Sequence, residues 1–232
     1  MTDERLTVTT PAGSFKAYVA RPAAETAPAI VVIQEIFGVN AVMRGVCDDL
    51  AAQGFIAICP DLFWRIEPGI DITDQSDAEW KKAFELYNAF DVDAGVVDIG
   101  ATIDLIRSDP QCSGKVGAVG FCLGGLLAYL TAARTDSDAS AAYYGVGIDK
   151  FIGEAVKVVR PLLVHIAEED QFVPKPAQEA IIAALKNHAH VEIHTYPGCD
   201  HAFARKGGEH YNAEAAAQAN QRTRTFFESA LR

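Results

Sequence analysis

The stretch Gly120-Phe121-Cys122-Leu123-Gly124 decides the fold of this chain. It follows a strand-like run, 115–119, and precedes a helix-like run, 126–134. A strand, a Gly-x-nucleophile-x-Gly turn and a helix in succession predict a nucleophile elbow, whose turn leaves no room for side chains at the flanking positions. The nucleophile is a thiol, where most such elbows have a hydroxyl. The pentapeptide alone also fits a small cysteine buried in a core, so the rest of the sequence has to decide.

The composition is that of a globular chain with one substantial core. The chain has 232 residues, of which 50% are hydrophobic, and a formal net charge of −11. Chains of this size with mixed helices and strands are often single domains, so we expect one domain over residues 1–232. A chain this acidic is a poor candidate for nucleic-acid binding. It also lacks the basic amphipathic helix that binds anionic membranes.

The cysteines and the amino-terminal residues indicate the compartment. The five cysteines are scattered and include no CxxC pair, which is unlike a disulfide framework or a zinc site. The amino-terminal residues 1–5 are mostly polar and lack an apolar signal core. The apolar run 29–33 is far too short to span a bilayer. We therefore expect a reducing cytoplasm, which suits a thiol nucleophile.

Strand-like and helix-like segments alternate along the chain. A hairpin is predicted for 6–10 and 15–20, and continuous apolar runs predict strands buried on both faces. The further expected strands are 29–34, 55–59, 115–119, 139–144, 161–166 and 191–196; the expected helices are 40–53, 77–90, 92–107, 126–134, 175–186 and 213–231. This alternation predicts an α/β fold with a mostly parallel sheet and helices on both faces. Ligands of such sheets bind beyond the carboxyl ends of the strands.

Two polar loops follow the later strands. Asp170 comes after the strand predicted at 161–166, and His201 comes after the one at 191–196. The order nucleophile, acid, histidine, each in a loop after a strand, is that of α/β-hydrolases. In that arrangement His201 exchanges the thiol proton and Asp170 orients the imidazole. Backbone amides at Leu123 and near Ile36 are expected to form the oxyanion hole.

Each of these side chains also has a structural interpretation. Asp170 is a possible cap of the helix after Pro174, with Glu168 or Glu169 as the acid instead, and His201 is a possible surface residue. His165 lies inside an apolar strand, which predicts a hydrogen-bonded core histidine. A loop-surface position is predicted for His210. A metal site remains an alternative for three histidines that alternate near the last strand, although they have no cysteine or carboxylate at a suitable spacing: His188, His190 and His194.

Nearly the whole chain resembles the dienelactone hydrolase family, also called carboxymethylenebutenolidases. The resemblance rests on the segments 34–38 (Gln-Glu-Ile-Phe-Gly), 60–63, 89–91, 120–125, 143–145 and 201–205. A cysteine elbow combined with Gln-Glu-x-Phe-Gly is specific, since most α/β-hydrolases have neither. The resemblance implies a small monomeric α/β-hydrolase without a large lid domain. It also implies that no metal or organic cofactor is needed.

Roles for further residues follow from this resemblance. In the family, the glutamate that matches Glu35 is thought to take the thiol proton when substrate arrives, which protects the resting thiol from oxidation. Arg205 matches an arginine that binds the carboxylate of the substrate, as a guanidinium can do with two hydrogen bonds. Phe37 and Tyr144 are further candidates for substrate contacts. The family substrate is an unsaturated lactone with a carboxylate, which is opened to maleylacetate in the breakdown of aromatic compounds.

The segment around Trp80 departs from the family pattern. A second arginine that binds substrate in the family corresponds to Trp80, and Phe84 stands where the family often has a tyrosine. Lys81 or Lys82 would supply a point charge instead, or both lie on a solvated helix face. The substrate is therefore less determined than the fold.

Three functions remain open at this stage. The first is a hydrolase that opens a carboxylated enol-lactone through a Cys-His-Asp triad and an acyl-enzyme. The second is a broader cysteine-dependent carboxylesterase or thioesterase acting on neutral esters. The third is a non-catalytic or redox-sensing relative, because a fold does not guarantee a function. In each enzymatic case the expected partner is a small lactone or ester.

Overall fold

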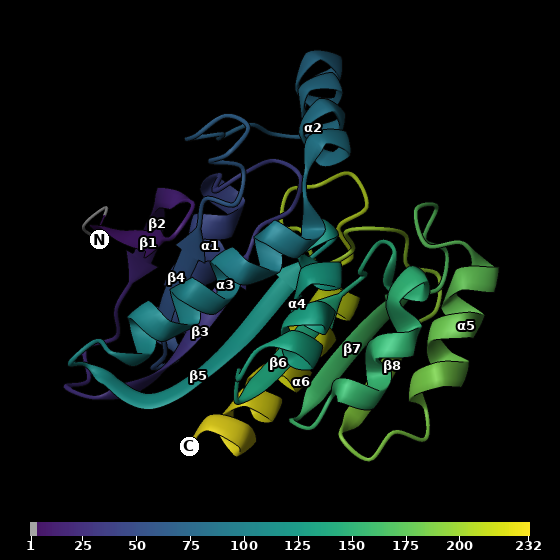
Figure 1. The fold of residues 1–232 in the computed structure, drawn as a ribbon. Coiled ribbons are helices and arrows are strands. Elements are labelled where there is room, and N and C mark those ends of the chain that lie inside the picture. Colours follow the sequence, from purple (N-terminus) through teal and green to yellow (C-terminus); the bar gives the residue numbers. More distant parts are fainter. Residues whose placement is uncertain (1–3) are drawn as a thin grey trace. The chain divides into compact units, whose positions relative to one another are not determined.

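The structure is a computed structural model that describes residues 4–232 (Figure 1). The first three residues of the acidic amino-terminal segment lie outside this range. The chain divides into two compact units, the first ending at Gly117 and the second beginning at Ala118. Strand β5 (Cys112–Phe121) begins in the first unit and ends in the second. Each unit is described by itself, and a single domain over the whole chain stays a prediction.

The first unit contains the predicted hairpin and the first buried strands. Its strand order is β1-β2-β4-β3-β5. The strands β1 (Glu4–Thr10) and β2 (Gly13–Ala20) pair antiparallel, and β3 (Ala27–Ile33) pairs parallel with β4 (Ile56–Pro60). All residues of β3 and β4 are buried, as their continuous apolar sequences predict.

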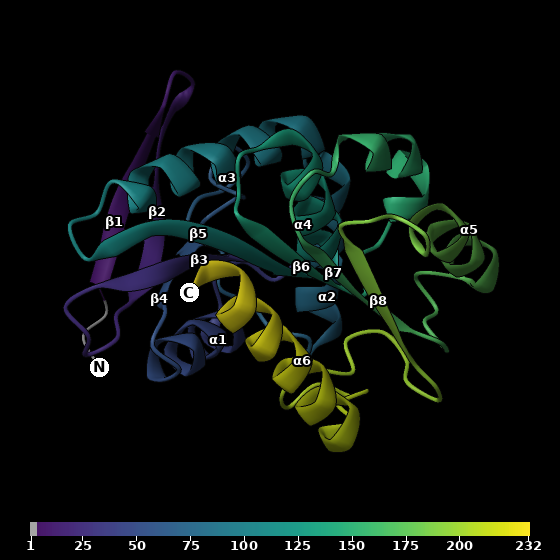
Figure 2. The same ribbon diagram turned by 90° about the horizontal axis from the view of Figure 1, so that it is seen from below.

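Helices cover both faces of the strands in the first unit (Figure 2). Helix α1 (Ala41–Ala52) and helix α3 (Val92–Arg107) pack against β3 and β4, and α2 (Asp77–Ala89) precedes α3. Helix α1 begins where Asn40 Oδ1 accepts a hydrogen bond from the Met43 amide at 3.1 Å, as an N-cap residue does. The segment from 61 to 73 is irregular, as predicted, and Arg65 and Trp64 in it both bind the buried carboxylate of Asp98 on α3.

The second unit holds the remaining parallel strands in the order β5-β6-β7-β8. These strands are β6 (Ala139–Tyr143), β7 (Leu162–Ala167) and β8 (Val191–Tyr196). Helix α4 (Leu123–Arg134) packs on β6, while α6 (Ala213–Leu231) packs on β6 and β7 from the other face (Figure 2). The unit also contains α5 (Lys175–Leu185) and a 3₁₀ segment, η1 (Ile148–Lys157), which was not predicted. The predicted helix after the elbow begins three residues earlier than expected, at Leu123.

A buried histidine joins β7 to α6 in the second unit. His165 is fully buried, with Nδ1 at 2.8 Å from the Tyr196 hydroxyl and Nε2 at 2.9 Å from the Thr223 hydroxyl. Its burial, together with the nearby His194 and Arg222, lowers the pKa of His165 well below the ordinary value. The prediction of a hydrogen-bonded core histidine is therefore confirmed.

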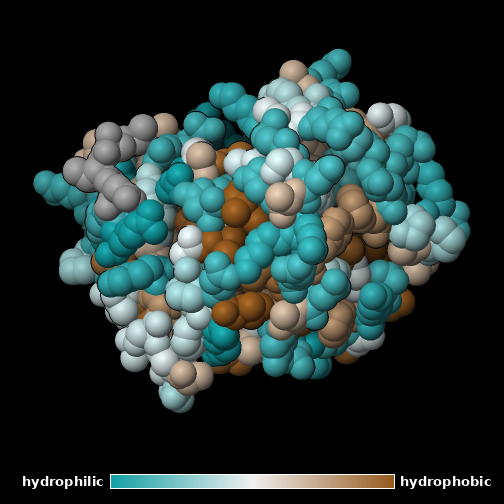
Figure 3. Space-filling model, turned by 90° about the horizontal axis from the view of Figure 1, so that it is seen from above, coloured by the Kyte–Doolittle hydropathy of each residue, from teal (hydrophilic) through white to brown (hydrophobic). Residues whose placement is uncertain are grey.

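Hydrophilic residues make up much of the surface that Figure 3 presents, with hydrophobic residues visible between them. Such a mixture is normal, because a folded chain has too little polar surface to cover itself completely. Within residues 4–232, no helix combines the length and the apolar character that crossing a membrane requires.

Candidate active site

The elbow holds Cys122 in a backbone conformation that non-glycine residues rarely adopt. Cys122 has φ 58° and ψ −116°, and α4 begins at the next residue, Leu123. A Cβ on Gly120 would lie 1.9 Å from the carbonyl oxygen of Gly124, and one on Gly125 would lie 2.3 Å from that of Tyr143. Glycine is thus required at both positions. Strained positions of this kind persist where the surrounding structure over-determines them, often at functional sites.

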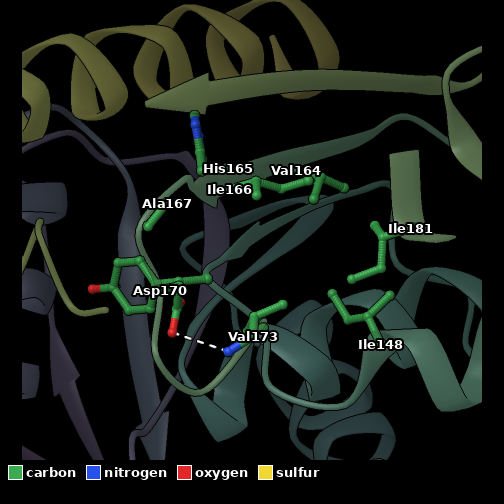
Figure 4. A pocket seen from close by; sticks show the side chains of 10 residues that line it. Ile148, Val164, His165, Ile166, Ala167, Asp170, Val173 and Ile181 are labelled. Atoms are coloured by element: carbon green, nitrogen blue, oxygen red, sulfur yellow. Dashed lines mark hydrogen bonds between the residues drawn. The ribbon is translucent and has the colours of Figure 1, made fainter. Parts of the chain in front are cut away.

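Asp170 is the carboxylate that pairs with His201. Its Oδ2 lies 2.8 Å from His201 Nδ1, and both side chains are almost completely buried. Its Oδ1 accepts hydrogen bonds from the amides of Phe172 at 2.8 Å and Val173 at 3.1 Å; the second is drawn in Figure 4. Asp170 therefore pairs with the histidine and does not cap helix α5, which has Pro174 at its N-cap position and no capping side chain. Glu169 instead lies 3.4 Å from the ammonium of Lys175.

His201 also forms a hydrogen bond with the side chain of Cys122. Because Nδ1 of His201 binds Asp170, the hydrogen bond with Cys122 is formed by Nε2. Burial lowers the pKa of His201, but the negative charges and hydrogen bonds of Cys122 and Asp170 outweigh it and raise the pKa to about 10. The ring is therefore stabilised as an imidazolium between a sulfur and a carboxylate.

Two aromatic rings flank the imidazole of His201. The ring centroid of Tyr144 lies 5.1 Å away and that of Phe172 lies 4.9 Å away, and both pairs are T-shaped. Tyr144 has φ 38°, another strained backbone position beside the triad. Phe172 is 37% exposed and was not singled out from the sequence, although it lies only two residues after Asp170.

A small cavity lies beside Asp170 in the same unit (Figure 4). Its volume is about 10 Å³, which is at the lower limit for a single water molecule. The side chains of Ile148, Val164, Val173 and Ile181 make most of its wall apolar. It is therefore a packing gap behind the acid rather than a space for a substrate.

Arg205, Leu123 and Tyr144 also belong to the second unit. Arg205 is 5% exposed, and a Cβ on Gly208 would come within 3.1 Å of its Cδ. Burial of an arginine is uncommon and indicates that its charge is compensated locally. Cys199, two residues before His201, is also buried, and burial raises the pKa of its thiol. A structural cysteine has this character, because the protonated thiol is unreactive.

Three residues named from the Gln34–Gly38 segment lie in the first unit. Glu35, Ile36 and Phe37 follow β3 directly and are 2%, 5% and 5% exposed. The turn is held by Gln34, whose side-chain oxygen accepts a hydrogen bond from the Leu62 amide at 3.0 Å. Glu35 is therefore a buried carboxylate at the carboxyl end of a central strand.

The aromatic candidates of the first unit form one cluster. The Trp80 ring stacks on Phe84 at 5.6 Å and meets the edge of Phe37 at 5.0 Å. The indole N–H of Trp80 donates to the carbonyl of Asp74 at 3.0 Å. Lys82 forms an ion pair with Glu67. Aromatic rings therefore form the cluster at this part of α2, and the charge of Lys82 is paired with Glu67 in the same unit.

No set of three or more His, Cys, Asp or Glu side chains in the described part of the chain is arranged to hold a metal ion. Among the histidines considered for a metal, His194 instead lies 2.6 Å from the carboxylate of Glu192.

Comparison with known proteins gives a consistent result. The sequence profile of the dienelactone hydrolase family matches residues 15–231. The chain belongs to the dienelactone hydrolase family. It is 52% identical over 230 residues to an Azospirillum brasilense protein provisionally named a carboxymethylenebutenolidase, covering 94% of this chain and 95% of the relative. It is 43% identical over 213 residues to the carboxymethylenebutenolidase of Pseudomonas putida, covering 92% and 90% of the two chains.

Similarity to solved structures shows that this member of the dienelactone hydrolase family has the α/β-hydrolase fold. A Klebsiella pneumoniae protein provisionally named a dienelactone hydrolase matches with a TM-score of 0.84 and 28% identity, covering 97% of both chains. The predictions of an α/β-hydrolase fold, of an amino-terminal hairpin and of a hydrolase are therefore confirmed.

Proposed function

We propose that this member of the family opens a carboxylated enol-lactone, a dienelactone, to maleylacetate, with Cys122 as nucleophile. The observation that supports the proposal best is the unbroken chain of hydrogen bonds from Cys122 through His201 to Asp170. The proposal also draws on relatives that are named carboxymethylenebutenolidases.

The reaction then follows from the roles of these groups. The Cys122 sulfur attacks the lactone carbonyl carbon, and the ring C–O bond breaks to leave a thioester on Cys122 and an enolate oxygen. His201 donates its proton to that oxygen, then takes a proton from a water molecule that attacks the thioester. The sulfur leaves as thiolate, which restores the starting state. Asp170 keeps the imidazole in the required orientation throughout.

Further residues enter this proposal through the family resemblance. Glu35 would receive the thiol proton, and amides of Leu123 and Ile36 would stabilise the oxyanion, where one such donor is typically worth about 3 kcal/mol. The neutral imidazole of His201 is a second acceptor for the same proton, because its protonated form is favoured in this site. The increase in thiolate absorbance when a substrate analogue binds, compared between wild type and Glu35→Gln, distinguishes the two acceptors. An equal increase in both proteins would assign the proton to His201 alone.

The carboxylate of the lactone is assigned to Arg205. A buried guanidinium suits this task, since it binds carboxylates through two parallel hydrogen bonds. Phe37 and Tyr144 would contact the unsaturated ring of the substrate. Small-molecule lactones or esters are the expected partners, and a monomer in a cytoplasmic setting remains our expectation.

A second candidate, hydrolysis of neutral esters, is favoured by the cluster around Trp80. Where the family resemblance implies a second arginine, this chain has a tryptophan stacked on Phe84. Lys82 forms an ion pair with Glu67, so its charge is not available to bind a substrate carboxylate in place of the arginine. Aromatic walls favour an apolar group over an anion, because burying an unpaired charge is costly.

One measurement separates these two functions. We would compare kcat/KM for a carboxylated dienelactone and for its neutral methyl ester on one preparation. A preference of about 100-fold for the acid, worth roughly 2.7 kcal/mol, is expected for a lactone hydrolase with an anion site. Equal or reversed values would assign the chain to neutral esters. Absence of any turnover, with Cys122 unreactive toward small electrophiles, would favour the non-catalytic alternative.

A further inference from the structure

The loops that carry Asp170 and His201 are linked by a clamp built on either side of the acid. The amide of Glu169, just before Asp170, donates to the carbonyl of Cys199 at 2.8 Å. The amide of Gln171, just after Asp170, donates to Oδ1 of Asp200 at 3.2 Å. Asp170 is therefore bracketed by two hydrogen bonds to the residues that directly precede His201.

Of these two hydrogen bonds, only the one to Asp200 involves a side chain. The same side chain also binds the backbone of His201. Its Oδ1 accepts a hydrogen bond from the His201 amide at 2.6 Å. One carboxylate oxygen thus receives an amide from each of the two loops. Oδ2 of Asp200 lies 3.8 Å from Nε2 of His210. The alternative role for Asp200 is therefore a partly exposed ion pair with His210.

The histidine loop needs such a restraint. Ala202, which follows His201, has φ 61°, a conformation that costs a non-glycine residue free energy. Gly198 in the same loop has φ 70°. A loop with these dihedral angles is outside the regular ladders of β8 and α6, so its position depends on individual hydrogen bonds. A shift of about 1 Å in a catalytic group can lower the rate about 100-fold.

We propose that Asp200 is a positioning residue for the reaction, because its carboxylate joins the acid loop to the histidine loop and holds His201 at hydrogen-bond distance from Asp170. The inference rests on the proposed function for its effect on rate, but its effect on the geometry of His201 is independent of it. Asp200 acts through the backbone of both loops and has no contact with substrate in this role.

The test is a comparison of Asp200→Ala and Asp200→Asn with wild type and two controls. Asp200→Ala removes both accepted hydrogen bonds, so kcat should fall about 10- to 100-fold with KM little changed. Asp200→Asn keeps an Oδ1 acceptor and should recover most of kcat. The control Asn212→Ala removes a comparable bond, in which Asn212 Oδ1 accepts from the Ala215 amide at 3.0 Å, and should leave kcat unchanged. His210→Ala tests the ion pair.

A second readout does not depend on turnover. The proton between His201 and Asp170 should give a far-downfield NMR signal that broadens or moves in Asp200→Ala but not in Asp200→Asn or Asn212→Ala. Unchanged kcat and an unchanged signal in Asp200→Ala would overturn the proposal. An equal loss of kcat in His210→Ala would assign the effect to the ion pair and also overturn it. If wild type hydrolyses no ester, the proposed function fails, and the NMR comparison still decides the role of Asp200. If Asp200→Ala does not fold, Asp200→Gly removes the same two hydrogen bonds, and a folded Asp200→Gly with the kcat of wild type would overturn the clamp.

Discussion

Two histidines in the second unit are nearly equally buried, and their protonation differs completely. His201 is 6% exposed and His165 is 0% exposed. The pKa of His201 is raised to about 10, while that of His165 is lowered well below the ordinary value. His201 bonds to a carboxylate and a sulfur, whereas His165 bonds to two hydroxyl groups. Burial alone therefore does not determine the protonation of a histidine. At His201 the charged neighbours outweigh the desolvation that favours the neutral ring.

The comparison also separates two tasks. The ring of His201 lies in a loop beyond the end of β8 and is arranged to carry charge. His165 lies inside β7 and links β8 and α6 through neutral hydrogen bonds with Tyr196 and Thr223. Variants at the partners of each histidine should therefore affect rate in the first case and stability in the second.

Replacing Cys122 with alanine should produce the largest effect. We expect kcat to fall on the order of 10⁵-fold, as for loss of a catalytic nucleophile. The pKa of His201 should fall at the same time, because the largest contribution that raises it comes from Cys122. Kinetics and an NMR titration of the imidazole measure both. Cys112→Ala is the control; retained activity in Cys122→Ala would refute the nucleophile.

Asp170→Asn should have the next largest effect. The amide cannot balance an imidazolium and favours the wrong tautomer, so kcat should fall about 10⁴-fold. The pKa of His201 should fall below its value of about 10 in wild type. The control Glu169→Gln changes the neighbouring carboxylate, which bonds to Lys175, and should leave kcat within about twofold. Similar losses in both variants would mean that Asp170 is not the acid of the triad.

His165→Ala should change stability and spare the chemistry. It leaves the hydroxyls of Tyr196 and Thr223 without their partner and opens a cavity, so unfolding free energy should fall by about 2–4 kcal/mol. The kcat of the folded fraction should stay near that of wild type. Urea denaturation measures the first quantity, with the exposed His190→Ala as control. A large loss of kcat at unchanged stability would contradict the structural role of His165.

The smallest expected effect is the dependence of stability on pH. The pKa of His165 is lower in the folded than in the unfolded chain, so its contribution is present above pH 6.5 and is lost as the pH falls further. Between pH 7 and pH 5 this amounts to about 2 kcal/mol, and it should be absent in His165→Gln. The raised pKa of His201 has the opposite sign: its contribution is present below pH 6.5 and is lost as the pH rises toward about 10. Equal acid sensitivity of wild type and His165→Gln would show that other groups cause it.

Much of the fold was predictable because its signals are local. Continuous apolar runs identified β3 and β4, and Asn40 and Gly54 marked the two ends of α1. The ten-residue segment η1 was missed, and it is a 3₁₀ helix, whose three residues per turn differ from the α-helical repeat. The helix after the elbow was placed too late because its first turn, at Leu123, consists of glycine and leucine without a capping side chain.

The sequence by itself determined the α/β-hydrolase fold, the family and the order of Cys122, Asp170 and His201, because these follow from periodicity, from glycines in a tight turn and from short motifs. Only the tertiary structure decided which acid bonds to His201, why His165 stays neutral while His201 is stabilised as a cation, and how Asp200 joins two loops. These properties depend on distances of a few ångströms between residues about 30 positions apart in the chain. No local pattern contains such distances, since folding alone brings the groups together.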